Sequence, residues 1–206
     1  MGELILTKAR ELFFSYGLKS VSMDDLAKGA GVSKKTIYQA FSDKNELVNK
    51  IVNDLVNCHH QLLRKSEGEA RDAIEEVLMQ SNASFDTWAS VNQAFFFELE
   101  KSFPDAWAKV EQHKQKILMP GIFKNLQRGI EENLYREDLD VVFTADIRIQ
   151  QLSSALQPAT FTGRRMNVSQ LINELTVFYL HGITTEKGKK ILYKYLKNRN
   201  ENKTDK

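Results

Sequence analysis

The chain has 206 residues, of which 42% are hydrophobic, and a formal net charge of +2 at pH 7. This apolar content is ample for a buried core, while no apolar run approaches the roughly 18 residues that a membrane-spanning helix needs. A single cysteine, Cys58, excludes an internal disulfide framework and fits a reducing cytosol, and no signal peptide is recognisable at the start. We therefore expect a soluble, cytoplasmic protein without a cofactor.

Apolar residues recur at helical spacing almost throughout the chain, and no stretch alternates like a strand, which predicts an all-α fold. The first helix is predicted to end at Gly17, which would serve as a glycine cap. Its expected buried stripe is Ile5, Ala9, Leu12, Phe13 and Tyr16.

Residues 22 to 47 predict two short helices joined by a tight turn, the helix-turn-helix arrangement. The small Ala27 lets the second helix approach closely, Gly31 allows the turn a positive φ, and Ile37 locks the second helix onto the first. These features favour a DNA-binding protein.

Both short helices carry sequence signals for their own start. Ser22 with Asp25 predicts a capping box for the first helix, and Ser33 is a favourable N-cap for the second. The second helix would then expose donors suited to phosphates and base edges. These are Lys34, Lys35, Thr36, Tyr38 and Gln39.

The rest of the chain predicts a series of longer helices. A helix opening at Asp43 should run to about Lys65, where Ser66-Glu67-Gly68 breaks it. Pro104 suits a helix start, and Pro120-Gly121 predicts a kink. The remaining predicted helices cover residues 70–89, 91–102, 105–133, 141–157, 168–183 and 186–198, with a polar connection at 133–140 and a loop from Pro158 to Asn167.

The helix over residues 168–183 is apolar on two faces, and a helix with an apolar face left over needs a partner. One face carries Leu171, Leu175, Phe178 and Gly182, and the other Ile172, Thr176, Tyr179 and Ile183. Together with the 141–157 helix it would form a two-fold, four-helix dimer interface. The predicted interface residues are Leu171, Leu175, Phe178, Tyr179 and Gly182.

A long ordered pattern in the first 47 residues resembles the tetracycline-repressor (TetR) family of bacterial transcriptional regulators. It reads Ala9-x-x-Leu12-Phe13-x-x-x-Gly17, then Ser22-Met23-x-x-Leu26-Ala27-x-x-Ala30-Gly31-Val32-Ser33, then Thr36-Ile37-Tyr38-x-x-Phe41-x-x-Lys44-x-x-Leu47. The resemblance implies a three-helix DNA-binding domain at 1–46, a larger helical effector-binding and dimerisation bundle at 47–198, and a polar basic tail at 199–206. It also implies a homodimeric repressor that binds a palindromic operator and is released by a small molecule.

The same resemblance assigns individual DNA contacts. Tyr38 and Lys44 match positions that contact phosphates in the family, and a lysine at a helix start is otherwise unfavourable, which points to an external anion. Ser22, Ser33 and Thr36 could serve as caps, as phosphate donors, or as both. Two positions depart from the family pattern, Lys35 where glycine is frequent and Ala40 where His or Tyr is frequent, and both should alter which operator is read.

The middle of the chain is rich in aromatic residues, and in the family this region forms the effector pocket. An apolar or aromatic ligand would fit such a composition, although each aromatic could equally be ordinary core. A ligand would favour a state in which the helix beginning near Lys44 tilts and moves the two DNA-reading heads apart. The candidate pocket residues are Trp88, Phe96, Trp107, His113 and Phe123.

Two other classes of function compete with a transcriptional regulator. No nucleophile motif, phosphate loop or metal spacing indicates an enzyme, and Cys58, His59 and His60 project about 100° apart on a helix, which disfavours a shared metal ion. A constitutive DNA-binding or nucleoid-type helical protein without an effector stays open as the alternative.

Overall fold

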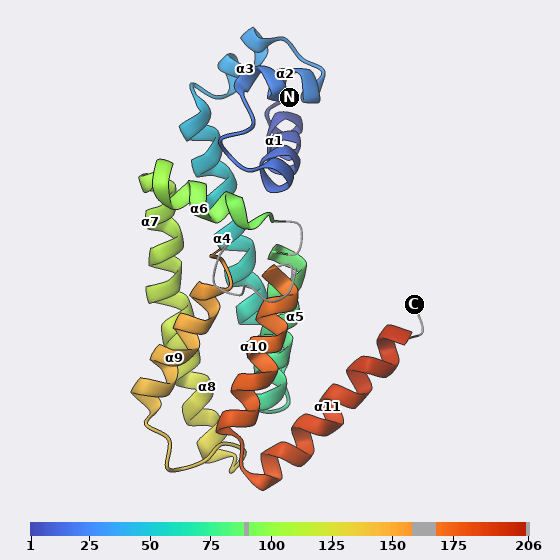
Figure 1. Cartoon of the computed structure of the whole chain (residues 1–206), viewed down its shortest axis with the longest axis vertical. Helices are drawn as coiled ribbons and strands as arrows, with labels where there is room; N and C mark the ends of the chain where they lie inside the picture. The colour runs from blue at the N-terminus through green and yellow to red at the C-terminus, as the bar shows by residue number, and fades with distance from the viewer. Residues whose placement is uncertain (89–90, 158–167, 205–206) are drawn as a thin grey trace.

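The computed structural model describes residues 1–88, 91–157 and 168–204, and within these ranges every regular element is a helix (Figure 1). The all-α prediction is confirmed. The molecule is elongated, with a small head of three helices at one end and a larger helical body below it. The head contains α1 (Gly2–Tyr16), α2 (Met23–Ala30) and α3 (Lys34–Ala40).

One long helix, α4 (Lys44–Glu69), runs from the head into the body. The body is completed by α5 (Ala73–Trp88), α6 (Gln93–Ser102), α7 (Pro104–His113), a π-helical turn (Lys114–Leu118), α8 (Met119–Glu131), α9 (Val141–Ser154) and α10 (Val168–Ile183). The last helix, α11 (Glu186–Thr204), diverges from the bundle and is longer than predicted. The predicted loop from Pro158 to Asn167 lies outside the described residues.

The first helix buries the predicted stripe with one exception. Ile5, Ala9 and Phe13 are almost inaccessible, but Tyr16 is 65% exposed, so its assignment to the core was wrong. Phe14 is buried instead, because its ring packs edge-on against Phe95 of α6, with 5.2 Å between ring centroids. The sequence of α1 alone could not show that α6 would cover Phe14.

The long helix begins at the predicted place and ends later than predicted. The Asp43 carboxylate accepts a hydrogen bond from the backbone N–H of Glu46 and caps the first turn. The predicted break near residue 66 was wrong, because the Ser66 hydroxyl donates to the Leu62 carbonyl and Gly68 is accommodated within the helix.

The predicted kink at Pro120 takes the form of a π-helical turn just before it. Proline lacks a backbone N–H, so the carbonyl one turn earlier loses its usual partner. The chain adjusts by widening the helix over Lys114–Leu118, and α7 and α8 continue on either side. Pro104 occupies the first turn of α7, as predicted.

The connection between α8 and α9 is less polar than predicted. Tyr135 is only 1% exposed, and its hydroxyl donates to the Ala73 carbonyl at 2.9 Å and lies 3.0 Å from the Asn125 side-chain oxygen. The ring rests directly on Gly129 of α8, where a Cβ atom would come within 2.0 Å of it. This contact fixes how the connection folds back over the lower end of the body.

In the described part of the chain, no helix is long and apolar enough to cross a membrane.

Replacing Gly129 with alanine should destabilise the body by about 2–4 kcal/mol, because the new methyl group displaces the Tyr135 ring and breaks its hydrogen bonds. Chemical denaturation followed by circular dichroism measures the loss. Gly68→Ala is the matched control, since nothing lies within 4 Å of its added methyl group. That helical substitution should stabilise the protein by about 0.5–1 kcal/mol. Equal stability of the two variants would contradict the packing described here.

Candidate DNA interface and internal cavity

The helix-turn-helix has the caps and the turn that the sequence predicts. The Ser22 hydroxyl accepts from the Asp25 N–H at 3.2 Å, and the Asp25 carboxylate accepts from the Ser22 N–H at 2.9 Å, completing the capping box. Ser33 caps α3 through the Thr36 N–H at 3.1 Å. Gly31 adopts φ 66°, the left-handed conformation that the turn requires.

The α3 helix presents a polar face to solvent at the tip of the head. Lys34, Lys35 and Gln39 are exposed, and Tyr38 is 46% exposed, whereas Ile37 is fully buried beneath them. The Lys34 ammonium forms a surface ion pair with Asp24 at 2.8 Å. Lys35 has no such partner among the described residues, which leaves it available to an external anion.

The side chain of Lys44 points into the protein rather than outward. Its ammonium donates to the carbonyl oxygens of Leu18 and Val21, the latter at 2.6 Å, and lies over the Phe13 ring. Burial lowers the pKa of Lys44, with Glu98 and Asp25 acting in the opposite direction. The sequence favoured an external anion as the explanation for a lysine here, but the backbone carbonyl oxygens of Leu18 and Val21 supply its partners instead. Its contact with DNA stays a prediction.

The end of α1 is fastened to α6 of the body. The Glu98 carboxylate accepts from the Lys19 backbone N–H at 2.8 Å, and the Asn92 N–H donates to the Phe14 carbonyl at 2.8 Å. The Asn92 amide also reaches the Ser15 carbonyl. Head and body are thus joined at two places, by the continuous α4 helix and by this α1–α6 junction.

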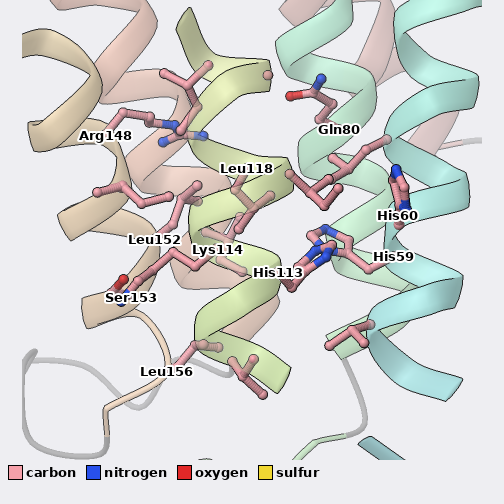
Figure 2. Close-up of a pocket in the computed structure, with 18 of the residues that line it drawn as sticks. His59, His60, Gln80, His113, Lys114, Leu118, Arg148, Leu152, Ser153 and Leu156 are labelled. Carbon is pink, nitrogen blue, oxygen red and sulfur yellow. The ribbon is translucent and has the colours of Figure 1, made fainter. Parts of the chain in front are cut away.

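The body encloses a cavity of about 1290 Å³ whose walls come from α4 to α10 and the π-helical turn (Figure 2). Figure 2 shows His59 and His60 on α4 facing Arg148, Leu152 and Leu156 across the opening. A cavity of this size, with mixed apolar and polar walls, can hold a small organic molecule.

The structure separates the predicted pocket residues. Phe96, Trp107 and His113 line the cavity. Phe123 does not line the cavity, so its assignment was wrong. It packs instead against a second apolar cluster of the body, which contains Leu126 and Leu180. The side chain of Trp88 lies outside the described residues.

Two histidines meet inside the cavity wall, a contact that the sequence did not predict. Nδ1 of His59 and Nε2 of His113 are 2.9 Å apart, and the His60 ring lies 6.4 Å from that of His113. Burial lowers the pKa of His59 to about 3 and that of His113 to about 4, and neighbouring imidazoles add to the effect. Cys58 is exposed, and no group of three potential ligands in the described residues could hold a metal ion.

Arg148 is a further cavity residue that the sequence did not predict. Its side chain is 5% exposed, Nη2 donates to the Thr176 hydroxyl at 2.7 Å, and the guanidinium lies 4.7 Å from the Tyr179 ring centroid. The available signal was its position on the otherwise apolar face of α9, between Ala145 and Leu152.

The α10 helix buries one of its two apolar faces and only part of the other. Phe178 is 71% exposed and Gly182 is exposed, as an interface would require. Leu171 and Tyr179 were wrongly assigned to an exposed interface, because they are 4% and 5% exposed within the chain's own core, and Leu175 is partly buried. The neighbouring α9 adds exposed apolar side chains that were not named: Val142, Phe143 and Ile147.

Comparison with known proteins agrees with this geometry. Residues 5–51, which contain the helix-turn-helix, match the family model for bacterial regulatory proteins of the tetR family. This N-terminal segment is therefore similar to the DNA-binding segment of TetR-family regulators.

The curated proteins that the chain is similar to are named as transcriptional regulators, not as enzymes. The chain is 26% identical over 147 residues to the probable regulator ArpR of Pseudomonas putida, covering 66% of this chain and 69% of ArpR. It is 28% identical over 145 residues to the repressor KstR2 of Mycobacterium tuberculosis, covering 68% of this chain and 71% of KstR2. Together with the helix-turn-helix, this similarity indicates a DNA-binding transcriptional regulator.

Solved structures share the whole fold. The structure of the ketosteroid regulator KstR2 superposes with a TM-score of 0.66 at 22% identity, covering 90% of this chain and 95% of that one. A regulator from Saccharomonospora viridis in complex with choline gives a TM-score of 0.72 at 19% identity, covering 90% and 98%. At this level of identity the likeness concerns the fold alone.

Replacing Lys35 with alanine should weaken binding to every duplex and reduce the slope of log K against log salt by about one, since one phosphate contact is lost. Fluorescence anisotropy at several salt concentrations measures both quantities. Lys190→Ala removes an equally exposed cation from α11, at the far end of the molecule, and should leave both unchanged. An unaltered slope for the Lys35 variant would contradict the assignment of this face.

The histidine pair should make stability depend on pH. In the unfolded chain these histidines become protonated near pH 6.5, whereas in the folded chain their pKa values are about 3 and about 4. The stability that their neutral forms contribute above pH 6.5 is therefore lost as the pH falls. The expected loss at pH 5 is roughly 1–2 kcal/mol for each histidine. Thermal unfolding between pH 5 and 7.5 measures it. A variant with both histidines replaced by glutamine should have a flatter profile, and an equally steep one would count against this assignment.

Proposed function

We propose that the protein is a cytoplasmic homodimeric repressor that binds a pseudo-palindromic operator and releases it when a small molecule enters the body cavity. The observation that carries this proposal is the combination of an exposed, capped recognition helix with a cavity of about 1290 Å³ in one chain. A constitutive nucleoid-type protein needs the first feature but has no use for the second. A small-molecule partner is supported by the Saccharomonospora viridis regulator, a protein of this fold that was solved in complex with choline.

A dimer is supported by the apolar surface that α9 and α10 leave uncovered. Phe143 and Phe178 are 63% and 71% exposed, on two helices that contact each other within the body. Exposed aromatic side chains of this kind mark protein interfaces, and a two-fold axis would use the same patch on both copies. Two recognition helices would then meet half-sites about one helical turn apart or somewhat more.

The route from cavity to DNA would use both connections between body and head. His59 and His60 of α4 line the cavity, while the start of the same helix packs beneath α1 and α3. Phe96 of α6 also lines the cavity, and neighbouring residues of α6 hold the end of α1. A ligand that displaces either helix would reorient the head, provided that it binds the two states with different affinity.

Selection of bound sequences from random duplex DNA tests the operator. The proposal expects an inverted repeat to be enriched, and footprinting to show a defined protected site on it. Protection of every sequence alike, with strong salt dependence and no preferred repeat, would instead identify the nucleoid-type alternative.

Phe178→Glu should convert the dimer to a monomer while leaving the fold intact, because the side chain is exposed in the single chain. Two copies lose about 2 kcal/mol or more each, which weakens dimerisation roughly a thousandfold. Sedimentation velocity gives the oligomeric state, and binding to the selected repeat should fall with it. Tyr193→Glu, which changes an aromatic residue of α11 that is 61% exposed, should remain dimeric. A monomeric wild-type protein at micromolar concentration would refute the dimer.

A further inference from the structure

We propose that Arg148 is the anchor for an acidic effector, an amphipathic monocarboxylic acid whose charged group binds the guanidinium and whose apolar part lies along the cavity wall. This inference rests on the proposed function, in that it names the class of small molecule the cavity would take. The observation behind it is that the buried guanidinium of Arg148 has no acidic partner among the described residues.

The guanidinium of Arg148 is buried without an acidic partner. Nη2 is bonded to the Thr176 hydroxyl, but Nη1 is buried and has no hydrogen-bond acceptor. No ion pair involving Arg148 occurs in the described part of the chain. The nearby titratable groups that act on its pKa are the phenols of Tyr179 and Tyr135, which raise it. Burial lowers that pKa to about 10, so the side chain still carries its charge at neutral pH.

An unpaired buried charge is costly, and proteins ordinarily pair it or replace it with an apolar side chain. The other buried charge of the cavity follows this rule, because the Glu76 carboxylate is bound by Arg128 at 3.1 Å. Arg148 therefore stands out as a charge whose partner is not supplied by the described protein. The carboxylate of a ligand would supply both the missing negative charge and two oxygen acceptors for the N–H groups of the Arg148 guanidinium.

The surroundings of Arg148 favour an acid with an apolar body. Leu152 of α9 and Leu156 in the turn just after it follow Arg148 at intervals of four residues, and both line the cavity beside the charge (Figure 2). Leu118 and Phe96 add apolar surface to the same cavity. The Ser81 hydroxyl, a second buried polar atom without a partner, also belongs to the lining and offers a further hydrogen bond.

A single negative charge is the best match. Among the other cations of the lining, Lys114 is paired with Glu111 at 2.7 Å and Lys124 with Glu67. The remaining lining cations, Arg64, Lys101 and Lys116, are exposed to solvent, so Arg148 is the buried one. A phosphate monoester with two charges would therefore bury more charge than Arg148 can balance. An amine or a neutral alcohol would leave Nη1 without its anion.

The test compares acids with alcohols of the same skeleton, using the full-length protein. The pairs are decanoate with decanol, oleate with oleyl alcohol, and 4-phenylbutyrate with 4-phenylbutanol, and decyl phosphate is added as the dianionic arm. Isothermal titration calorimetry measures binding, and quenching of tryptophan fluorescence reports it independently, because Trp107 lines the cavity. For at least one pair we expect the acid to bind roughly 10- to 100-fold more tightly than its alcohol, and decyl phosphate to bind more weakly than decanoate.

Arg148→Met should remove the preference, with the affinity for the acid falling to that for the alcohol. Lys114→Met is the matched control, because it removes a cavity cation that already has a partner, and it should keep the preference. The unliganded Arg148 variant should melt no lower than the wild type, since an uncompensated buried charge has been removed. A purely structural arginine would instead lower the melting temperature and leave the acid preference unchanged.

Two results would overturn the inference: no acid of the panel exceeding its alcohol, or a preference that survives in Arg148→Met. Tighter binding of decyl phosphate would refute the monocarboxylate class. Operator binding is measured separately on the selected inverted repeat. Intact repeat binding with no acid preference would defeat the inference alone, whereas acid binding without any preferred repeat would defeat the proposed repressor.

Discussion

The structure depends on one apolar core that is continuous from the head to the cavity and is assembled along α4. The first turns of that helix bury Leu47 and Val48 beneath the head, and later turns bury Leu55 and Val56 in the body. The same cluster reaches Leu171 of α10. Since a close-packed interior transmits displacement, the head cannot adopt an orientation independent of the body that supports it.

In the described residues, buried polar side chains are almost all satisfied, and those that are not concentrate around the cavity. The Lys44 ammonium donates hydrogen bonds to two carbonyl oxygens in the segment between α1 and α2. At the opposite end of the molecule, the Tyr135 hydroxyl donates to the Ala73 carbonyl. In contrast, two of the three buried side-chain atoms that lack partners in the described structure, on Ser81 and Arg148, line the cavity. Unsatisfied polarity is unfavourable for folding, so its concentration here is consistent with a site completed by a ligand.

The features that the sequence alone determined are those fixed by interactions between near neighbours. The capping box of Ser22 and Asp25, the Ser33 cap and the positive φ of Gly31 each involve residues within four positions of one another, and all were predicted. The helical class followed from apolar periodicity, and the long motif around Tyr38 sufficed to indicate the family. The polar face of α3 was equally predictable, because Ile37 fixes which side is buried.

Only the tertiary structure decided where side chains point when distant segments compete for them. Lys44 turns inward because carbonyls of residues 18 and 21 lie beneath it, and Tyr179 belongs to the core because Arg148 lies against its ring. The contact between His59 and His113 joins residues 54 positions apart. Periodicity shows that a helix has an apolar face but not which element covers it, because burial and charge pairing depend on distances in space that the order of residues does not contain.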